Sequence, residues 1–202
     1  MKNRWSDDEA RSWIAQCDGN GIDENLALRL YSARLLGQDR DLVLHGGGNA
    51  SLKRYLADPL GDEQAVLFIK GSGWDMGDIE PAGLPAVRLA PLQRLRSLSA
   101  LDDLSMVNLL RGNLLDTQAP DPSVETLLHA FLPATFVDHT HASAILALSD
   151  QPDGDGLCAD VFADVAAVVP YAMSGLALAK AAAEAYHGQP DCRGLILAKH
   201  GL

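Results

Sequence analysis

Two connections next to strand-like segments of this 202-residue chain are short glycine turns. The turn 46–49 (Gly-Gly-Gly-Asn) separates the apolar run 41–45 from an extended segment at 51–56, and the turn 71–73 (Gly-Ser-Gly) follows a β-rich run at 66–70. Strands joined without a crossover of about a dozen residues cannot pair in parallel. Elsewhere helix-like and strand-like segments alternate. We therefore predict an α/β layered domain with a mixed sheet.

The other periodicities predict where the remaining elements lie. We expect helices at 24–36, from 102 or 103 to 115, at 124–131, 142–148 and 174–187, and strands at 136–139, 165–169 and 194–199. The first twenty residues are polar without clear periodicity, 81–91 looks irregular, and 151–156 is expected to be a loop. Because the chain has no repeats and no long linker, we predict one domain over residues 1–202.

The charge balance and the cysteines limit the environment and the partners. Sixteen Lys and Arg against 27 Asp and Glu give a formal net charge of −11, whereas a general nucleic-acid binder or a protein of anionic membrane surfaces needs the opposite sign. No window approaches about 18 consecutive apolar residues, and the acidic first ten residues are no signal peptide. Three distant cysteines without a C-x-x-C pair indicate reduced thiols. We therefore expect a cytoplasmic protein.

The segment His139–Thr140–His141 is the strongest local signal for chemistry. Alternate side chains of a strand point to the same face, so the two imidazoles can share one metal ion. A catalytic zinc ion has three protein ligands and an open position. We take His200, directly after the strand at 194–199, as the candidate third ligand, although two unrelated histidines and a polar residue that closes a strand are alternatives. The rival histidines are His45, His129 and His187.

Glu125 lies near the start of the helix expected at 124–131, two residues after Ser123. In one interpretation Ser123 caps the helix and Glu125 stabilises its first turn, which together contribute about 0.5–2 kcal/mol. In the other, the carboxylate faces the metal site and acts as a general acid or base. The residues alone leave both open, and the capping interpretation is the simpler one.

The glycine turns are candidates for binding an anion. The first lacks the G-x-G-x-x-G spacing of dinucleotide-binding proteins, and a strand rather than a helix follows it. Several backbone N–H groups in one concavity can nevertheless bind phosphate without a basic side chain. In the second turn Ser72 adds a hydroxyl and Lys70 a nearby ammonium group. A tight hairpin explains each turn equally well when it is taken alone.

Five segments in order along the chain resemble the class II aldolase/adducin family of zinc-dependent sugar-phosphate aldolases. The matching segments are His45–Ser51 (HGGGNAS), Lys70–Gly73 (KGSG), Pro122–Glu125 (PSVE) with His129, Asp138–His141 (DHTH) and Ala198–Leu202 (AKHGL). The amino-acid sequence around Glu125 and His139 is most similar to the aldolase part of bifunctional rhamnulose-1-phosphate aldolase/short-chain dehydrogenase proteins. Each motif is weak singly, and five in register make the resemblance specific.

The resemblance implies a three-layer α/β/α fold with a mixed, largely antiparallel central sheet, and a homo-oligomer, usually a tetramer. It implies that His139, His141 and His200 bind Zn²⁺ or another divalent metal, and that Glu125 is the catalytic acid or base. The residues implied to bind the phosphorylated sugar substrate are Gly48, Asn49, Ser72, Gly73 and Ser123, to which we add Lys70. The implied reaction is cleavage of a ketose 1-phosphate to dihydroxyacetone phosphate and an aldehyde.

Two departures from the family pattern qualify this expectation. No tyrosine lies between His141 and Val165, where the family's aldolases place one, so the general acid is unassigned; Tyr171 comes later. Family members also continue well past the third histidine, so we expect this chain to lack their C-terminal segment. The alternatives are a sugar-phosphate epimerase or dehydratase on the same scaffold, or a non-catalytic adducin-like module. A fused or separate dehydrogenase partner is a further expectation.

Overall fold

The computed structural model describes residues 2–163 and 165–202. The helices are α1 (Asp7–Asp18), α2 (Glu24–Gly37), α3 (Leu89–Arg94), α4 (Asp103–Gly112), α5 (Thr126–Phe131), α6 (Ser143–Ser149), α7 (Gly154–Phe162) and α8 (Leu176–Gly188). The strands are β1 (Asn49–Ala57), β2 (Glu63–Ile69), β3 (Ala86–Arg88), β4 (Phe136–His139), β5 (Ala166–Val169) and β6 (Gly194–Leu197). No helix of the described part is both long and apolar enough to cross a bilayer.

The strands form two sheets. The first is antiparallel in the order β3-β2-β1-β4, and the second is the parallel pair β5-β6, which α8 connects as a crossover helix. Thr140, directly after β4, exchanges two 2.9 Å backbone hydrogen bonds with Leu202, and Leu197 of β6 pairs with Gly201. The end of β4 is thereby connected to the end of β6. The predicted α/β class with a largely antiparallel sheet is confirmed, with its parallel pair in a separate sheet.

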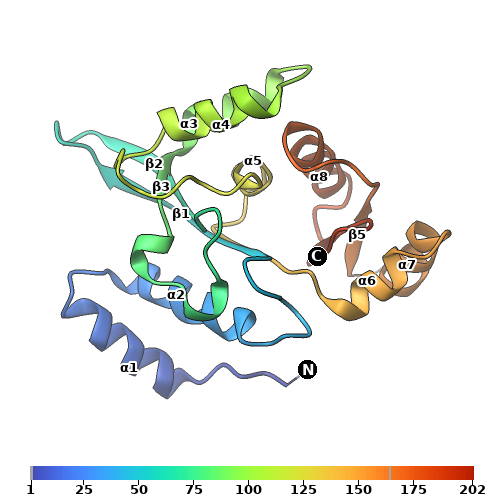
Figure 1. Cartoon of the computed structure of the whole chain (residues 1–202), viewed down its shortest axis with the longest axis horizontal. Coiled ribbons are helices and arrows are strands. Elements are labelled where there is room, and N and C mark those ends of the chain that lie inside the picture. The colour runs from blue at the N-terminus through green and yellow to red at the C-terminus, as the bar shows by residue number, and fades with distance from the viewer. Residues whose placement is uncertain (1, 164) are drawn as a thin grey trace.

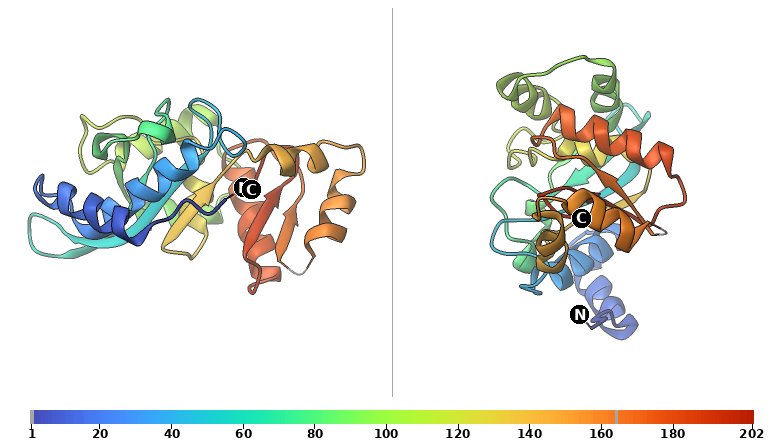
Figure 2. Two further views of the ribbon diagram at one scale, coloured as in Figure 1. Left: turned by 90° about the horizontal axis from the view of Figure 1, so that it is seen from below. Right: turned by 90° about the vertical axis from the view of Figure 1, so that its right-hand side faces the viewer.

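Helices cover both faces of the first sheet, with α1 and α2 on one side and α3, α4 and α5 on the other (Figure 1). Residues alternate in direction along a strand, so Ala50 of β1 packs with Leu30 of α2, whereas Leu67 and Ile69 of β2 pack with Leu127 of α5. The segment from α6 to β6 lies beside this first layered part (Figure 2). This arrangement is the expected three-layer α/β/α architecture.

Several expected elements are displaced or were missed. The polar N-terminus forms α1, which Ser6 caps by accepting a hydrogen bond from the N–H of Glu9. The segment expected to be irregular at 81–91 contains β3 and the start of α3, and α7 begins inside the loop expected at 151–156. Helix α4 ends at Gly112, three residues early, and α8 follows Gly175 with no capping bond from Ser174.

Candidate metal centre

Four side chains selected from the sequence meet at one place in the fold. His139 ends β4 and His141 follows it by two residues. Glu125 directly precedes α5, and His200 lies in the turn after β6. One ligand atom of each residue lies within 4.8 Å of those of the others. Oε1 of Glu125 is 3.0 Å from Nε2 of His200 and 3.3 Å from Nε2 of His139.

The close contact between β4 and the turn after β6 positions His200. Gly201 lies so near Thr140 that a Cβ atom there would be 2.2 Å from the carbonyl oxygen of Thr140. Lys199, just before His200, has a φ of +58°, the left-handed conformation that turns the chain back. The backbone pairing of Leu202 with Thr140 completes this connection. The position of the third histidine therefore depends on backbone contacts with Thr140, the residue between the other two histidines.

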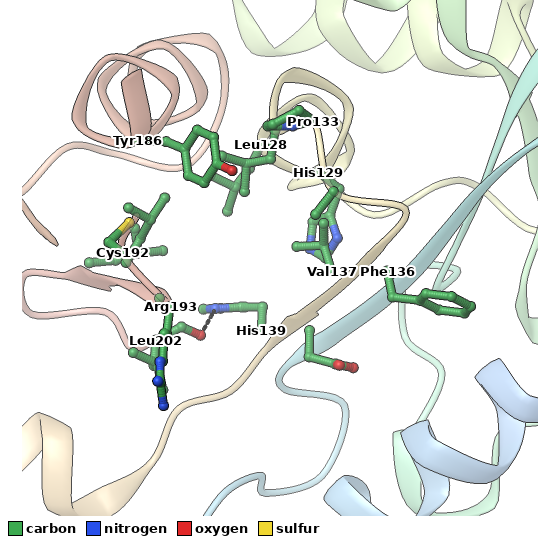
Figure 3. Close-up of a pocket in the computed structure, with 16 residues that line it drawn as sticks. Leu128, His129, Pro133, Phe136, Val137, His139, Tyr186, Cys192, Arg193 and Leu202 are labelled. Carbon is green, nitrogen blue, oxygen red and sulfur yellow. Dashed lines mark hydrogen bonds between the residues drawn. The ribbon is translucent and has the colours of Figure 1, made fainter. Parts of the chain in front are cut away.

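The hydrogen bonding of His139 orients its ring for coordination. Its Nδ1 atom is 3.0 Å from the carbonyl oxygen of Leu202, the contact drawn in Figure 3. Because a carbonyl oxygen only accepts, Nδ1 carries the hydrogen of this bond, and Nε2 is the ring nitrogen that faces the other three side chains. His139 is 2 % exposed, so this orientation is held inside the protein.

The donor set fits a divalent cation. Nε2 of His139 and Nε2 of His141 lie 3.0 Å apart. Burial, followed by the charge of nearby His139, lowers the pKa of His141 to about 4, so the ring of His141 is neutral at pH 7. Two facing lone pairs repel unless a cation or a proton lies between them. Three imidazoles with one carboxylate are ligands that zinc and related transition metals accept.

Glu125 is held as a carboxylate. Burial alone raises the pKa of Glu125, but its neighbours His139, His200 and Asn49 lower it well below its usual range. Nδ2 of Asn49 donates to Oε2 of Glu125 at 3.2 Å and to Oγ of Ser123 at 2.7 Å. Oγ of Ser123 also accepts from the N–H of Glu125 at 3.2 Å. Helix α5 begins at Thr126, with Glu125 itself at the N-cap position and no side-chain capping bond, so the expected cap by Ser123 is wrong. Ser123 instead stabilises the turn before the helix, and the carboxylate of Glu125 lies in the cluster.

The first glycine turn packs directly against the metal centre. Gly48 has a φ of +66°, and a Cβ atom there would lie 2.9 Å from the carbonyl oxygen of His139. A Cβ atom at Gly47 would lie 3.1 Å from Nδ1 of His141. Side chains at these two positions would push away His139 and His141. The turn can approach the two histidines this closely because both residues are glycine.

The second glycine turn lies next to the first and next to Ser123. The N–H of Ser72 donates to the carbonyl oxygen of Asp121, and the N–H of Ser123 donates to that of Lys70. A Cβ atom at Gly46 would be 3.8 Å from the carbonyl oxygen of Gly73, which has a φ of +80°. The structure thus brings together the residues predicted to bind substrate. That they bind it stays a prediction.

The three rival histidines lie outside the cluster. His45 is exposed and has a φ of +51°. His187 is exposed in the last turn of α8, as expected. His129 of α5 is buried and its Nδ1 atom is 2.8 Å from Oγ of Ser51.

His129 lines a cavity of about 390 Å³ between α5, β4, α8 and β6 (Figure 3). Of the four clustered residues, only His139 lines that cavity.

Another cavity, of about 420 Å³, reaches His200 and is also lined by Val124, Tyr171, Met173 and Lys199. The hydroxyl of Tyr171, which the sequence placed in a turn without a role, is 3.1 Å from Sδ of Met173. This cavity borders the metal centre at His200, and it brings the phenol of Tyr171 into the same space as that histidine.

An ion pair behind the centre, between a buried arginine and a partly exposed aspartate, was not predicted from the sequence. Arg29 of α2 is 1 % exposed and pairs with Asp138, which precedes His139 on β4. Its Nη2 atom also donates to Oγ of Ser32 at 2.8 Å. An arginine among the apolar positions of the helix expected at 24–36 was the available signal, because such a residue is buried only with a partner.

Comparison with known proteins agrees with this geometry. Residues 29–202 match the sequence model of a family described as Class II Aldolase and Adducin N-terminal domain. Over 173 residues the chain is 35% identical to the uncharacterized oxidoreductase YuxG of Bacillus subtilis (strain 168), covering 86% of this chain and 25% of that protein. The chain therefore spans about a quarter of the length of this curated relative.

Two solved structures share the fold. The N-terminal class II aldolase domain of a conserved protein from Thermoplasma acidophilum has a TM-score of 0.86 at 34% identity, covering 100% of this chain and 87% of that one. L-fuculose-1-phosphate aldolase from Thermus thermophilus has a TM-score of 0.50 at 22% identity, covering 86% and 77% of the two chains. At that identity the second likeness concerns the fold alone.

Proposed function

Because the chain belongs to the family of class II aldolases and adducin N-terminal domains, we propose that it is a zinc-dependent lyase. The proposed reaction cleaves a ketose 1-phosphate of the rhamnulose or fuculose type to dihydroxyacetone phosphate and an aldehyde. The observation that carries this proposal is the convergence of His139, His141, His200 and Glu125 within 4.8 Å. The name of the fuculose-phosphate aldolase among the structural neighbours agrees with this substrate class.

In this proposal the three histidines hold the ion through ring nitrogens. A bound zinc ion supplies Lewis-acid stabilisation of negative charge on the substrate's oxygens. The hydrogen bond from His139 to Leu202 keeps Nε2 free for coordination, and burial keeps His141 neutral. Their role is to present lone pairs in one place without rearrangement.

Glu125 moves the proton. Glu125 is unprotonated in the resting site, so its carboxylate is available to accept a proton from a substrate carbon in the direction of aldol addition. In the direction of cleavage the same carboxyl returns the proton to that carbon. Asn49 binds the carboxylate of Glu125 and Ser123 binds its backbone N–H, so the proton is delivered from one position.

The glycine turns supply the local positive field that an acidic protein needs for an anionic substrate. With a formal net charge of −11, the chain attracts phosphate only where fixed N–H dipoles or a cation act at short range. We assign the phosphate to Gly48, Ser72, Gly73 and Ser123, and the aldehyde portion to the cavity that reaches His200. Asn49 is shared between the phosphate site and Glu125.

The name of the Bacillus relative, an oxidoreductase about four times as long as the matched segment, agrees with a dehydrogenase partner in the same protein. We include that partner, a homo-oligomer and a cytoplasmic location in the proposal. An epimerase or dehydratase would use the same metal and phosphate sites, and an adducin-like module would use neither.

The test is product analysis on a panel of ketose 1-phosphates, with wild type, Glu125→Gln and the exposed control Glu184→Gln. Wild type and the control should release dihydroxyacetone phosphate, and a chelator should abolish the reaction. Glu125→Gln should fold and bind metal yet lose turnover by about 10²-fold or more. An isomeric sugar phosphate as the only product would instead identify an epimerase. Full activity in Glu125→Gln with a lowered melting temperature would show that the carboxylate is structural.

A further inference from the structure

Lys70, directly after β2, is buried among the two glycine turns. Its side chain is 3 % exposed. Its Nζ atom donates to the carbonyl oxygen of Gly46 in the first turn at 2.9 Å and to that of Trp74, after the second turn, at 2.8 Å. An ammonium group has three hydrogens, so two of them are used within the protein.

The backbone of the same residue contacts two further parts of the site. The N–H of Lys70 donates to the carbonyl oxygen of Ala50 on β1 at 3.1 Å. Its carbonyl oxygen accepts from the N–H of Ser123 at 3.2 Å. Lys70 is therefore bonded to four segments: the first turn, the start of β1, the end of the second turn and the segment before α5.

The ammonium group of Lys70 provides the hydrogen bonds that connect the first glycine turn to the end of the second. Among residues 2–163 and 165–202, no other hydrogen bond joins 46–49 to 71–74. Burying an ammonium group is unfavourable unless carbonyl or carboxylate oxygens surround it. Burial accordingly lowers the pKa of Lys70, while the negative charges of Glu125 and Asp75 oppose this. A hydrogen bond that a charged ammonium group donates to a carbonyl oxygen is stronger than a hydrogen bond between neutral groups.

We propose that Lys70 is a positioning residue that holds the two glycine turns together, rather than a side chain that contacts the substrate itself. This inference rests on the proposed function, in which the turns bind the phosphate. By fixing Gly46 relative to Trp74, Lys70 sets the distance between the backbone N–H groups of the two turns. Its loss weakens phosphate binding without removing a metal ligand or Glu125.

The test compares Lys70→Met with Lys53→Met. Lys53 of β1 is a matched control, because its Nζ atom also donates to a carbonyl oxygen, that of Ala134, at 2.7 Å, away from both turns. Two measurements are made on each variant: amide hydrogen exchange at 46–49 and 71–74, and kcat and KM for the ketose phosphate. A charged hydrogen bond contributes about 1.5–3 kcal/mol, which corresponds to about a tenfold change or more.

For Lys70→Met we expect exchange in both turns and KM to rise by about tenfold or more, with kcat within about threefold. Lys53→Met should change neither. Unchanged exchange with a raised KM would identify Lys70 as a direct ligand and overturn the inference. An equal loss of kcat and kcat/KM with unchanged exchange would also overturn it. If Lys70→Met does not fold, Lys70→Gln is judged by the same criteria.

The two proposals fail in different ways. If wild type cleaves no ketose phosphate, the proposed function is wrong, yet amide exchange still decides whether Lys70 holds the turns. Inorganic phosphate then serves as the probe, and in wild type it should slow exchange at 46–49 and at 71–74 together. Protection of only one turn in wild type would show that the turns act separately and would overturn the inference.

Discussion

Acid should destabilise this protein through one histidine that takes no part in metal binding. His129 is fully buried, its Nδ1 atom contacts Ser51, and its Nε2 atom has no hydrogen-bond partner among the described residues. Burial, with a smaller contribution from the charge of His139, lowers the pKa of His129 to about 3. Protonating this ring in the folded protein places a charge at a buried position where Nε2 has no hydrogen-bond acceptor among the described residues.

The sign and size of the effect follow from the two pKa values. In the unfolded chain the imidazole takes up its proton near pH 6.5, whereas in the folded protein it does so only near pH 3. The stabilisation is complete above pH 6.5 and is lost progressively as the pH falls toward 3. The whole window corresponds to about 5 kcal/mol, and the part between pH 6.5 and 4.5 to about 3 kcal/mol.

The assay is urea unfolding at pH 7 and pH 4.5 of wild type, His129→Gln and the control His187→Gln, all with chelator. His187 is exposed, so its replacement removes a histidine without removing the buried one. Between the two pH values wild type and the control should lose about 3 kcal/mol more than His129→Gln. Equal losses in all three proteins would refute the reasoning, because the buried imidazole would then contribute nothing to acid sensitivity.

Two further substitutions test the contacts that position the histidines. Gly201→Ala places a Cβ atom 2.2 Å from the carbonyl oxygen of Thr140, so we expect about 1–3 kcal/mol of destabilisation and weaker metal binding. Gly188→Ala is the control, because a Cβ atom at Gly188 would meet no atom within 4 Å. Urea unfolding and a metal titration are measured for both variants. Asp138→Asn removes the charged partner of the buried Arg29 and should cost about 1–3 kcal/mol, more than Arg29→Met, which leaves only a partly exposed carboxylate. Equal losses for Asp138→Asn and Arg29→Met in urea unfolding would contradict that asymmetry.

The elements that could be predicted are those whose sequence pattern matches their environment. The strand at 136–139 is found at those residues, and the helix expected at 24–36 begins after Asp23, whose carboxylate caps it as an N-cap residue should. His139 and His141 were selected because a strand has a two-residue period, although β4 ends at His139 and His141 lies beyond the strand. That His200 joins them depends on the contact of Gly201 with Thr140, which sequence spacing does not encode.

What could not be predicted depends on tertiary contacts. Helix α1 is mostly polar and buries only Ala10 and Cys17. Its apolar residues Ala10, Trp13, Ile14 and Cys17 recur at helical spacing, and this short stripe among polar residues was the signal that was missed. Lys70 was predicted to face the substrate, because an ammonium group beside a glycine turn suggests an anion site. Its bonds to two backbone carbonyl groups follow from the approach of the two turns, which only the fold establishes.

The central claim, that three imidazoles share one metal ion, is tested most directly by the metal content of the purified protein after exposure to zinc and removal of the excess. The proposed centre predicts one ion per chain in wild type and in the control His187→Ala. His141→Ala should retain much less, since one of the three ring ligands is gone. Equal metal content in wild type and His141→Ala, or none in wild type, would contradict the assignment.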